Sequence, residues 1–263
     1  MSVNPLIIGH RGASAVAPEN TMAAFHKAIE VGAEGIEFDV RLSKDGVPVV
    51  IHDETLQRTA GRPERVADLS STDLETTDVG SWFSRARGLG TRDFAGETIP
   101  TLRRLLDEFS NSDALLYLEL KCLPLEVRQI AVTICQMLAN NQIRDRVIIE
   151  CFDLSAIAEV KRLAPELKTA ALFEPKISDP VSLLPGQMLI ERAKAVSADQ
   201  IALHRQLVHR RTIEQARRAE LKVVVWTVDD PSWLARSRKY GIDCIITNDP
   251  ALLVQKRNAT YAI

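Results

Sequence analysis

The 263-residue sequence predicts an α/β protein, a closed (β/α)₈ TIM barrel with a small insertion after the second strand. Short apolar runs alternate with longer amphipathic segments along the whole chain, which is typical of a parallel sheet whose strands are joined by helices. About eight such units fit into this length, and eight units close a barrel. A doubly wound open sheet is the alternative, but the sequence lacks the G-x-G-x-x-G turn that would support it.

Apolar runs of strand length recur through the chain. The second and third runs are separated by the turn residues Lys44-Asp45-Gly46, which indicates a hairpin. The other runs are followed by helical patterns. The expected strands are Leu6–Gly9, Gly35–Leu42, Val47–Ile51, Leu115–Leu120, Arg146–Cys151, Leu167–Leu172, Gln200–His204, Leu221–Thr227 and Asp243–Thr247.

Amphipathic segments predict the helices. The first carries Met22, Phe25 and Ile29 on one face and ends at Glu30. Asn20 or Thr21 can cap its start, and we expect Asn20 to act as a cap rather than as a site residue. Later helices are expected over Leu125–Asn140, Leu154–Leu163, Gln187–Ala195, Arg211–Ala219 and Pro231–Tyr240.

One segment interrupts this alternation. Residues 55–98 are polar, rich in Gly, Ser, Asp and Arg, and contain no strand of normal length. We expect an insertion with a short helix at Ser71–Glu75 that covers the barrel mouth, because loops this long in a compact domain are usually functional or disordered. No second domain is indicated, so residues 1–263 form a single domain.

Composition restricts the possible partners. A formal net charge of −2 gives no reason to expect binding to nucleic acid or to an anionic membrane. The 4 cysteines are widely spaced without a C-x-x-C pair, so we expect buried thiols rather than a zinc cluster or a disulfide framework. The sequence shows neither a signal peptide nor an apolar stretch of about 20 residues. These features predict a cytoplasmic protein without stable membrane insertion, and they leave the oligomeric state open.

Two expected strands carry charged residues at alternate positions. Glu37 and Asp39 point to one side of their strand, and Glu119 and Lys121 share one side of the next barrel strand. Such charges are costly in a barrel interior unless they are compensated. A divalent cation would compensate them, and oxygen ligands favour Mg²⁺ or Ca²⁺ over zinc. A network of salt bridges among these residues, without a metal, is the alternative.

Two histidines fall at strand ends, where barrel enzymes carry their chemistry. His10 ends the first strand and His52 follows the hairpin, which favours acid and base roles. Arg11 is suited to hold two phosphate oxygens. We expect Asp53 to cap the following turn rather than to orient His52. Trp226 ends the seventh barrel strand, where it is either a wall for the alcohol end of a substrate or an ordinary core aromatic.

Several motifs occur together in a characteristic order. They are HRGASAVAPENTMAAF, EFDVRLSKDGVPVVIHDETLQRT, GSWF, IPTL, YLELK, ECFD, VWTVDDP and ITNDP. This series resembles the glycerophosphodiester phosphodiesterase family, over residues 6 to about 250. The resemblance implies a TIM barrel with a small insertion after the second strand, in agreement with the pattern above.

The resemblance also implies roles for individual residues. It places Glu19, in the Pro-Glu-Asn-Thr motif, near the site. It implies metal ligands at Glu37, Asp39 and Glu119, acid–base histidines at His10 and His52, and phosphate-contacting cations at Arg11 and Lys121.

The expected function is hydrolysis of a small glycerophosphodiester to glycerol 3-phosphate and an alcohol, with Mg²⁺ or Ca²⁺. One alternative is a lysophospholipase D-type activity on lipid diesters, although the polar insertion argues against a wide apolar mouth. The other is a non-catalytic barrel that binds phosphodiesters. The sequence leaves open which histidine is the acid and whether a substrate hydroxyl or water attacks.

Overall fold

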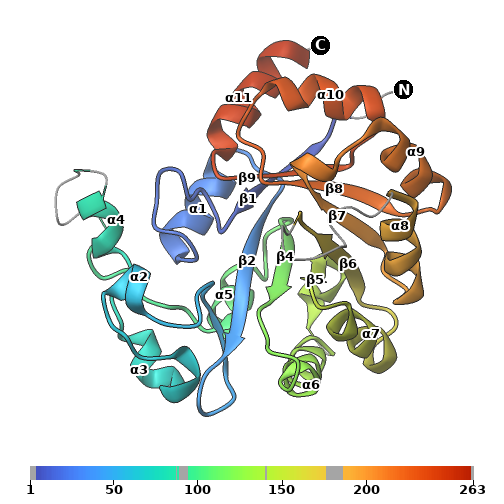
Figure 1. Cartoon of the computed structure of the whole chain (residues 1–263). Coiled ribbons are helices and arrows are strands. Elements are labelled where there is room, and N and C mark those ends of the chain that lie inside the picture. The colour runs from blue at the N-terminus through green and yellow to red at the C-terminus, as the bar shows by residue number, and fades with distance from the viewer. Residues whose placement is uncertain (1–3, 87, 89–93, 140, 176–185, 262–263) are drawn as a thin grey trace.

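Eight parallel strands surround a common axis in the computed structural model of the chain (Figure 1). The structure describes residues 4–86, 88, 94–139, 141–175 and 186–261. Because β1 pairs with both β2 and β9, the barrel is closed and the predicted TIM-barrel fold is confirmed. The barrel strands are β1 (Leu6–His10), β2 (Gly35–Leu42), β4 (Leu115–Leu120), β5 (Val147–Cys151), β6 (Lys168–Phe173), β7 (Gln200–His204), β8 (Lys222–Trp226) and β9 (Cys244–Thr247).

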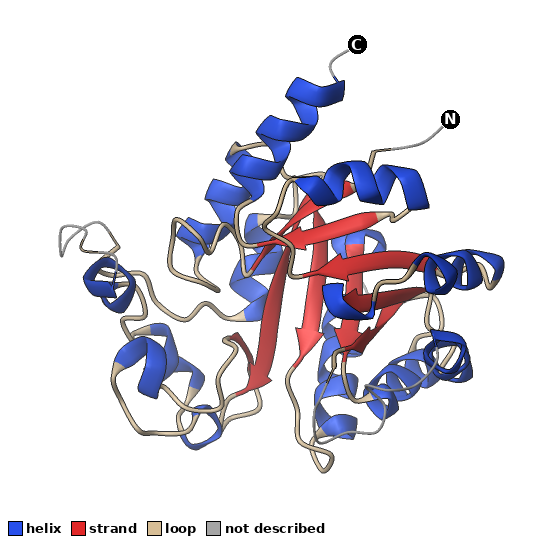
Figure 2. Ribbon diagram, turned by 45° about the horizontal axis from the view of Figure 1, so that its top comes forward, coloured by secondary structure: helices blue, strands red, loops and turns tan. Residues whose placement is uncertain are grey.

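Helices pack around the outside of the strands (Figure 2). They are α1 (Met22–Glu30), α5 (Leu102–Glu108), α6 (Val127–Leu138), α7 (Leu154–Leu163), α8 (Gly186–Ala195), α9 (Arg210–Arg218), α10 (Ser232–Tyr240) and α11 (Pro250–Tyr261). Short 3₁₀ turns lie at Gln142–Arg146 and Arg205–Leu207. Helices α5 and α11 are additions to the predicted set. The side chain of Thr101 caps α5 by accepting a hydrogen bond from the backbone N–H of Arg104.

The strand β3 (Pro48–Val50) pairs antiparallel with β2, as the hairpin pattern predicts. After it come α2 (Gln57–Ala60), the 3₁₀ turn Val66–Asp68, α3 (Ser71–Glu75) and α4 (Ser81–Ala86). This part of the chain forms a lobe beside β2 (Figure 1) with its own apolar cluster, which includes Leu56 and Leu74. Residues 87 and 89–93 of the predicted insertion lie outside the described residues.

The alternation of side chains along β2 separates the core from the site. Ile36, Phe38 and Val40 face outward into the apolar layer between barrel and helices, where Phe38 packs edge-on against Phe25. Glu37 and Asp39 therefore face the barrel interior. Below them an apolar cluster that includes Tyr117 fills the barrel. The packed interior leaves the carboxyl ends of the strands as the place for chemistry.

Candidate active site

Strand register brings the charged side chains of separate strands to one level. His10 on β1 lies beside Glu37, and Asp39 on β2 lies beside Glu119 on β4. Glu119 in turn is beside Glu150 on β5. Residues that are far apart in sequence thus form one belt across neighbouring strands near their carboxyl ends.

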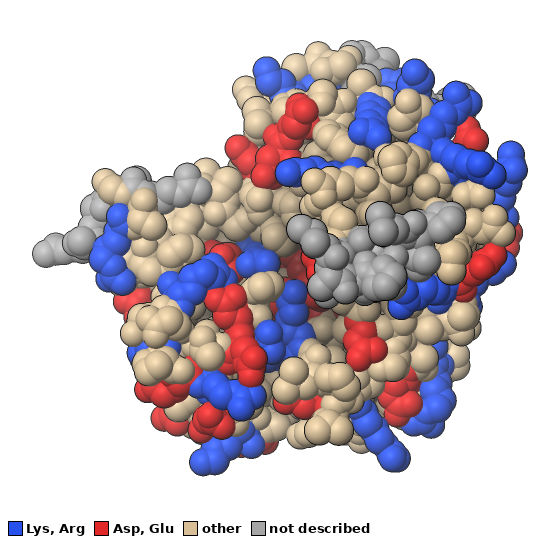
Figure 3. Space-filling model, viewed as in Figure 1, with Lys and Arg blue, Asp and Glu red and all other residues tan. Residues whose placement is uncertain are grey.

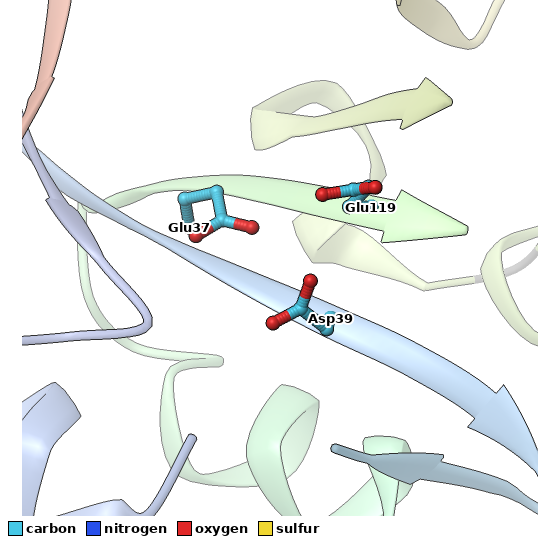
Figure 4. Close-up of side chains that lie close together, drawn as sticks. All are labelled: Glu37, Asp39 and Glu119. Atoms are coloured by element: carbon cyan, nitrogen blue, oxygen red, sulfur yellow. The ribbon is translucent and has the colours of Figure 1, made fainter. Parts of the chain in front are cut away.

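Three carboxylates of this belt converge (Figure 4). Glu37, Asp39 and Glu119 are all buried, and each offers an oxygen within 4.8 Å of the oxygens of the other two. Oε2 of Glu37 accepts a hydrogen bond from the Arg11 backbone N–H at 2.9 Å. Among the described residues, its Oε1 has no hydrogen-bond partner although it is buried. This geometry, with oxygen donors only, fits a Mg²⁺ or Ca²⁺ ion.

Burial and the neighbouring charges shift the pKa values of these three carboxylates. Burial and the neighbouring Asp39 raise the pKa of Glu37 well above its usual value. The same two causes raise the pKa of Glu119 to about 7. Burial would also raise the pKa of Asp39, but Arg11 and Lys121 together outweigh it and hold that pKa below its ordinary value. The fully ionised cluster would therefore carry more negative charge than its protein surroundings neutralise.

Two cations adjoin the cluster. Nζ of Lys121 lies 2.6 Å from Glu119 and 3.2 Å from Asp39, and the Arg11 guanidinium lies 3.2 Å from Asp39. These ion pairs are part of the salt-bridge network that is the alternative to a metal site. The network leaves Glu37 without a lysine or arginine side chain at ion-pair distance among the described residues, so the salt bridges alone do not compensate all three carboxylates.

His10 is partly buried at the end of β1 and is held by the loop after β9. Its Nδ1 lies 2.7 Å from Oδ1 of Asn248, and the Asn248 amide nitrogen donates to Asp229 at 2.9 Å. Because Oδ1 can only accept, Nδ1 of His10 carries the hydrogen and Nε2, 3.8 Å from Glu37, is left for other partners. Burial and the positive charge of Arg11 lower the pKa of His10 to about 4.

His52 is oriented by its neighbour in sequence. Its Nδ1 lies 2.7 Å from Oδ1 of Asp53, and Arg58 donates two hydrogen bonds to the same carboxylate. The expectation that Asp53 only caps a turn is therefore wrong. The tertiary position of Arg58 on α2, which the sequence does not reveal, turns this carboxylate toward the imidazole. Burial lowers the pKa of His52.

The segment after β1 has an unusual backbone. Arg11 and Asn20 adopt left-handed conformations with φ of 53° and 58°, which are rare outside glycine and collect at functional sites. Gly12 has φ of 83°, and a Cβ there would lie 2.5 Å from the Ala24 backbone carbon. Only glycine allows this close approach, which lets the chain turn directly after Arg11.

Asn20 has a different role from the expected one. Thr21, not Asn20, caps α1 through a hydrogen bond from the Ala24 backbone N–H. The Asn20 side chain instead donates to Oδ2 of Asp39 at 2.8 Å and accepts from the Asp39 backbone N–H at 3.2 Å. Its left-handed backbone turns the amide away from the helix end, so the expectation that it caps the helix is wrong.

A cavity of about 490 Å³ opens above the belt, and all but two of the predicted site residues line it. Glu19 and Asp39 lie just behind the lining, where both contact Arg11. Trp226 ends β8 and packs edge-on against Phe152, with ring centroids 5.4 Å apart. The lining consists of His10, Arg11, Glu37, His52, Glu119, Lys121, Glu150, Phe152, Leu172, Glu174, Trp226, Thr227 and Ile246.

Sequence reasoning missed Glu150, which is buried and lines the cavity. The predicted strand contained it, and strand alternation places it on the same face as Ile148 in the barrel interior. Its position beside Glu119 follows from the pairing of β4 with β5, which one sequence does not specify. The alternation was therefore a signal that could have identified it as an inward carboxylate.

The mouth combines both signs of charge. Figure 3 shows acidic and basic side chains next to one another in the hollow between the lobe and the barrel.

A second cavity, of about 550 Å³, opens at the opposite end of the barrel under Tyr117 and Gln200. The carboxylate cluster and both site histidines are absent from its lining, so the mouth cavity is the candidate active site. Among the described residues, no helix has the length and apolarity needed to cross a membrane.

A barrel with oxygen donors, cations and histidines at its carboxyl-end mouth defines a class of enzymes that act on phosphate esters. Residues 10–252 match the glycerophosphoryl diester phosphodiesterase family, so the chain belongs to this family of phosphoric diester hydrolases. A glycerophosphodiester phosphodiesterase of Caldanaerobacter subterraneus subsp. tengcongensis is 34% identical over 95% of this chain and 96% of its own length.

Solved structures show the same likeness. An Oleispira antarctica phosphodiesterase in complex with the product sn-glycerol-3-phosphate superposes with a TM-score of 0.82 and 26% identity, over 96% of each chain. A glycerophosphodiester phosphodiesterase of Agrobacterium tumefaciens superposes with a TM-score of 0.76 and 28% identity, over 95% of this chain and 99% of its own. These similarities support both the family and the fold.

Proposed function

We propose that this enzyme hydrolyses glycerophosphodiesters to sn-glycerol 3-phosphate and an alcohol in a reaction that depends on a divalent cation. The observation that carries the proposal is the cluster of Glu37, Asp39 and Glu119 at the base of a cavity that two cations and two histidines also line. The family supports it, as does the product bound to the Oleispira antarctica relative.

The three carboxylates would hold the cation. Their donors are oxygens, and one oxygen of Glu37 is buried without a hydrogen-bond partner among the described residues. These features suit Mg²⁺ or Ca²⁺. When bound, such an ion withdraws charge from a phosphoryl oxygen and so stabilises the transition state.

Arg11 and Lys121 would bind the remaining phosphate oxygens. Both line the cavity, and both pair with Asp39 beneath it. Glu19 orients Arg11 through a hydrogen bond of 2.7 Å. Because the two cations already stand where phosphoryl charge develops, they act without reorganising during the reaction.

The two histidines would move the protons. His10 bonds a neutral amide at Nδ1, which leaves Nε2 as an uncharged acceptor for a proton from the attacking hydroxyl. His52 bonds the Asp53 carboxylate, which stabilises its imidazolium form. It is thus suited to give a proton to the leaving alkoxide.

We propose that the described residues of the segment 55–98 border the mouth of this cavity. Arg58 from this segment bonds both Glu19 and Asp53, with 2.7 Å separating it from each Glu19 oxygen. Glu19 orients the phosphate-binding Arg11, and Asp53 orients His52. The segment thereby joins the phosphate-binding side of the site to an acid–base histidine.

A substrate panel tests the proposal. The purified enzyme, with Mg²⁺ or Ca²⁺, is assayed on glycerophosphocholine, glycerophosphoethanolamine and lysophosphatidylcholine, and released sn-glycerol 3-phosphate and free alcohol are measured. We expect turnover of the two small diesters to exceed that of the lipid. A higher rate on lysophosphatidylcholine would instead identify a lysophospholipase D-type activity. Binding of these diesters without any product over hours would indicate a non-catalytic barrel.

A further inference from the structure

Apart from the proposed metal ligands and phosphate-binding cations, two residues that line the mouth cavity each have a buried polar atom without a hydrogen-bond partner among the described residues. One is an acceptor, Oε2 of Glu150, and the other is a donor, the indole Nε1–H of Trp226. Both residues line the cavity, and Glu150 is only 2% exposed. The proposed metal ligands and acid–base histidines account for neither atom.

The two residues are connected by packing. Glu150 faces the barrel interior from β5, and Phe152 follows it by two residues. The Trp226 ring crosses from β8 to lie against the Phe152 ring, with centroids 5.4 Å apart. Glu150 and Trp226 both line this cavity, and the indole packs against the residue that lies two positions after Glu150. Glu150 is also the cross-strand neighbour of Glu119, so this part of the lining adjoins the proposed phosphate site.

A buried polar atom without a partner loses its bonds to water and gains none in return, which destabilises the fold. Such atoms in native proteins are usually satisfied by water or by a ligand. A hydroxyl group suits this pair, since it can donate to a carboxylate and accept from an N–H at the same time. An ammonium group could donate to Glu150, but it offers nothing to the indole N–H.

We propose that Glu150 and the Trp226 indole N–H form a hydroxyl-binding subsite that recognises the polyol arm of the phosphodiester. This inference rests on the proposed function, because it takes the phosphate to be held by Arg11 and Lys121. A phosphate held there places a glycerol arm beside the wall that carries Glu150. The terminal hydroxyl of that arm then donates to Oε2 of Glu150 and accepts from Nε1 of Trp226.

This subsite explains how the enzyme would select glycerol diesters. A site built to bond a hydroxyl discriminates strongly against an analogue that lacks it, since binding the analogue leaves buried polar groups unpaired. The alcohol on the other side of the phosphate makes neither contact. Selection therefore acts on the glycerol arm rather than on the leaving alcohol.

A cycle of substrate and enzyme changes tests this assignment. Glycerophosphocholine is compared with its analogue that lacks only the terminal hydroxyl and keeps the hydroxyl next to the phosphate ester. We expect kcat/KM of the unaltered enzyme to fall by about 10- to 100-fold on the analogue, the range for hydrogen bonds to charged groups. The ratio of kcat/KM between the two substrates should shrink to within about threefold in Glu150→Leu and to within about tenfold in Trp226→Phe.

Trp82→Phe provides a matched control, because Trp82 also has a buried Nε1 without a partner among the described residues but lies outside the cavity lining. Its preference for the terminal hydroxyl should equal that of the unaltered enzyme. Thermal unfolding of each variant checks its fold, and Glu150→Gln provides an isosteric second variant, for which a weakened preference is expected.

Calorimetric binding of sn-glycerol 3-phosphate and of propane-1,2-diol phosphate gives a readout that does not need turnover. If the unaltered enzyme binds sn-glycerol 3-phosphate more tightly and Glu150→Leu loses this difference in affinity, the subsite is supported. This holds even if every diester in the panel is inert, and in that case only the proposed function fails. Equal affinity for the two ligands, or an equal loss of both in Glu150→Leu, overturns the subsite. The unaltered enzyme could instead prefer the choline diester over the diester of its neutral isostere, 3,3-dimethylbutanol. If that preference disappeared in Glu150→Gln, the hydroxyl subsite would also be overturned, because Glu150 would then bind the ammonium group.

Discussion

His10 and Asn248 are 238 residues apart in sequence, yet Nδ1 of His10 lies 2.7 Å from Oδ1 of Asn248. Asp229 fixes the Asn248 amide from behind, through hydrogen bonds to its side chain and to its backbone N–H. The β1 histidine is thereby held in one tautomer by the loop that follows β9. Its partner His52 is held by a carboxylate instead, so the two imidazoles differ in the charge of the group behind them.

Replacement of Asn248 by alanine should lower kcat by about 10- to 100-fold, the usual effect of removing a group that orients an active-site histidine. The backbone N–H of residue 248 would still donate to Asp229, so the loop should keep its place. Steady-state kinetics provide the measurement. Ser14→Ala removes the other donor to Oδ1 of Asn248 and should change kcat less than threefold. Equal losses in the two variants would argue against a role in orienting His10.

Asp53→Asn should also lower kcat by about 10- to 100-fold, because the amide no longer stabilises a protonated His52. Diesters with an acidic leaving alcohol need little proton donation, so kcat should fall less on a p-nitrophenyl phosphodiester than on glycerophosphocholine. Comparison of the two substrates measures this difference. Identical losses on both substrates would contradict the assignment of His52 as the acid.

Glu37→Gln should weaken divalent-cation binding and lower kcat at least about 100-fold, since it removes one of the three carboxylates and the charge behind transition-state stabilisation. Titration calorimetry with Mg²⁺ and Ca²⁺ measures the affinity directly. Glu159→Gln, which changes a carboxylate paired with Arg162 on the outer helix α7, serves as the control and should bind the ions normally. Unchanged affinity in Glu37→Gln would remove this residue from the metal site.

Cation affinity should fall as the pH falls through about 7. Burial and Asp39 raise the pKa of Glu119 to about 7, so below that pH the ion must displace a proton. Above it Glu119 is already charged, so the ion no longer competes with a proton at this residue. Affinity should therefore drop by up to about tenfold per pH unit for each proton displaced. Titrations from pH 5.5 to 8.5 would show this slope, and a flat profile would contradict it.

The fold could be predicted because each strand has a clear apolar pattern. The bounds of β4 (Leu115–Leu120), β7 (Gln200–His204) and α7 (Leu154–Leu163) coincide with those expected from the sequence. In each case a periodic apolar run ends at turn or polar residues, so local patterning determines the boundary.

Parts of the site could not be predicted, because they depend on partners that are distant in sequence. Asn20 is an ordinary capping residue by type, and only the approach of Asp39 reveals its other role. Asp53 orients His52 because Arg58 occupies its other side. Glu150 joins the site through the register between β4 and β5, which a single sequence leaves undetermined.

The most direct test of the central claim is phosphorus NMR of glycerophosphocholine incubated with the purified enzyme. We expect conversion to sn-glycerol 3-phosphate, loss of that conversion on addition of EDTA, and recovery when Mg²⁺ or Ca²⁺ is returned in excess. Conversion that continues at full rate in EDTA would contradict the metal role of Glu37, Asp39 and Glu119. The absence of sn-glycerol 3-phosphate with every cation would contradict the proposed reaction itself.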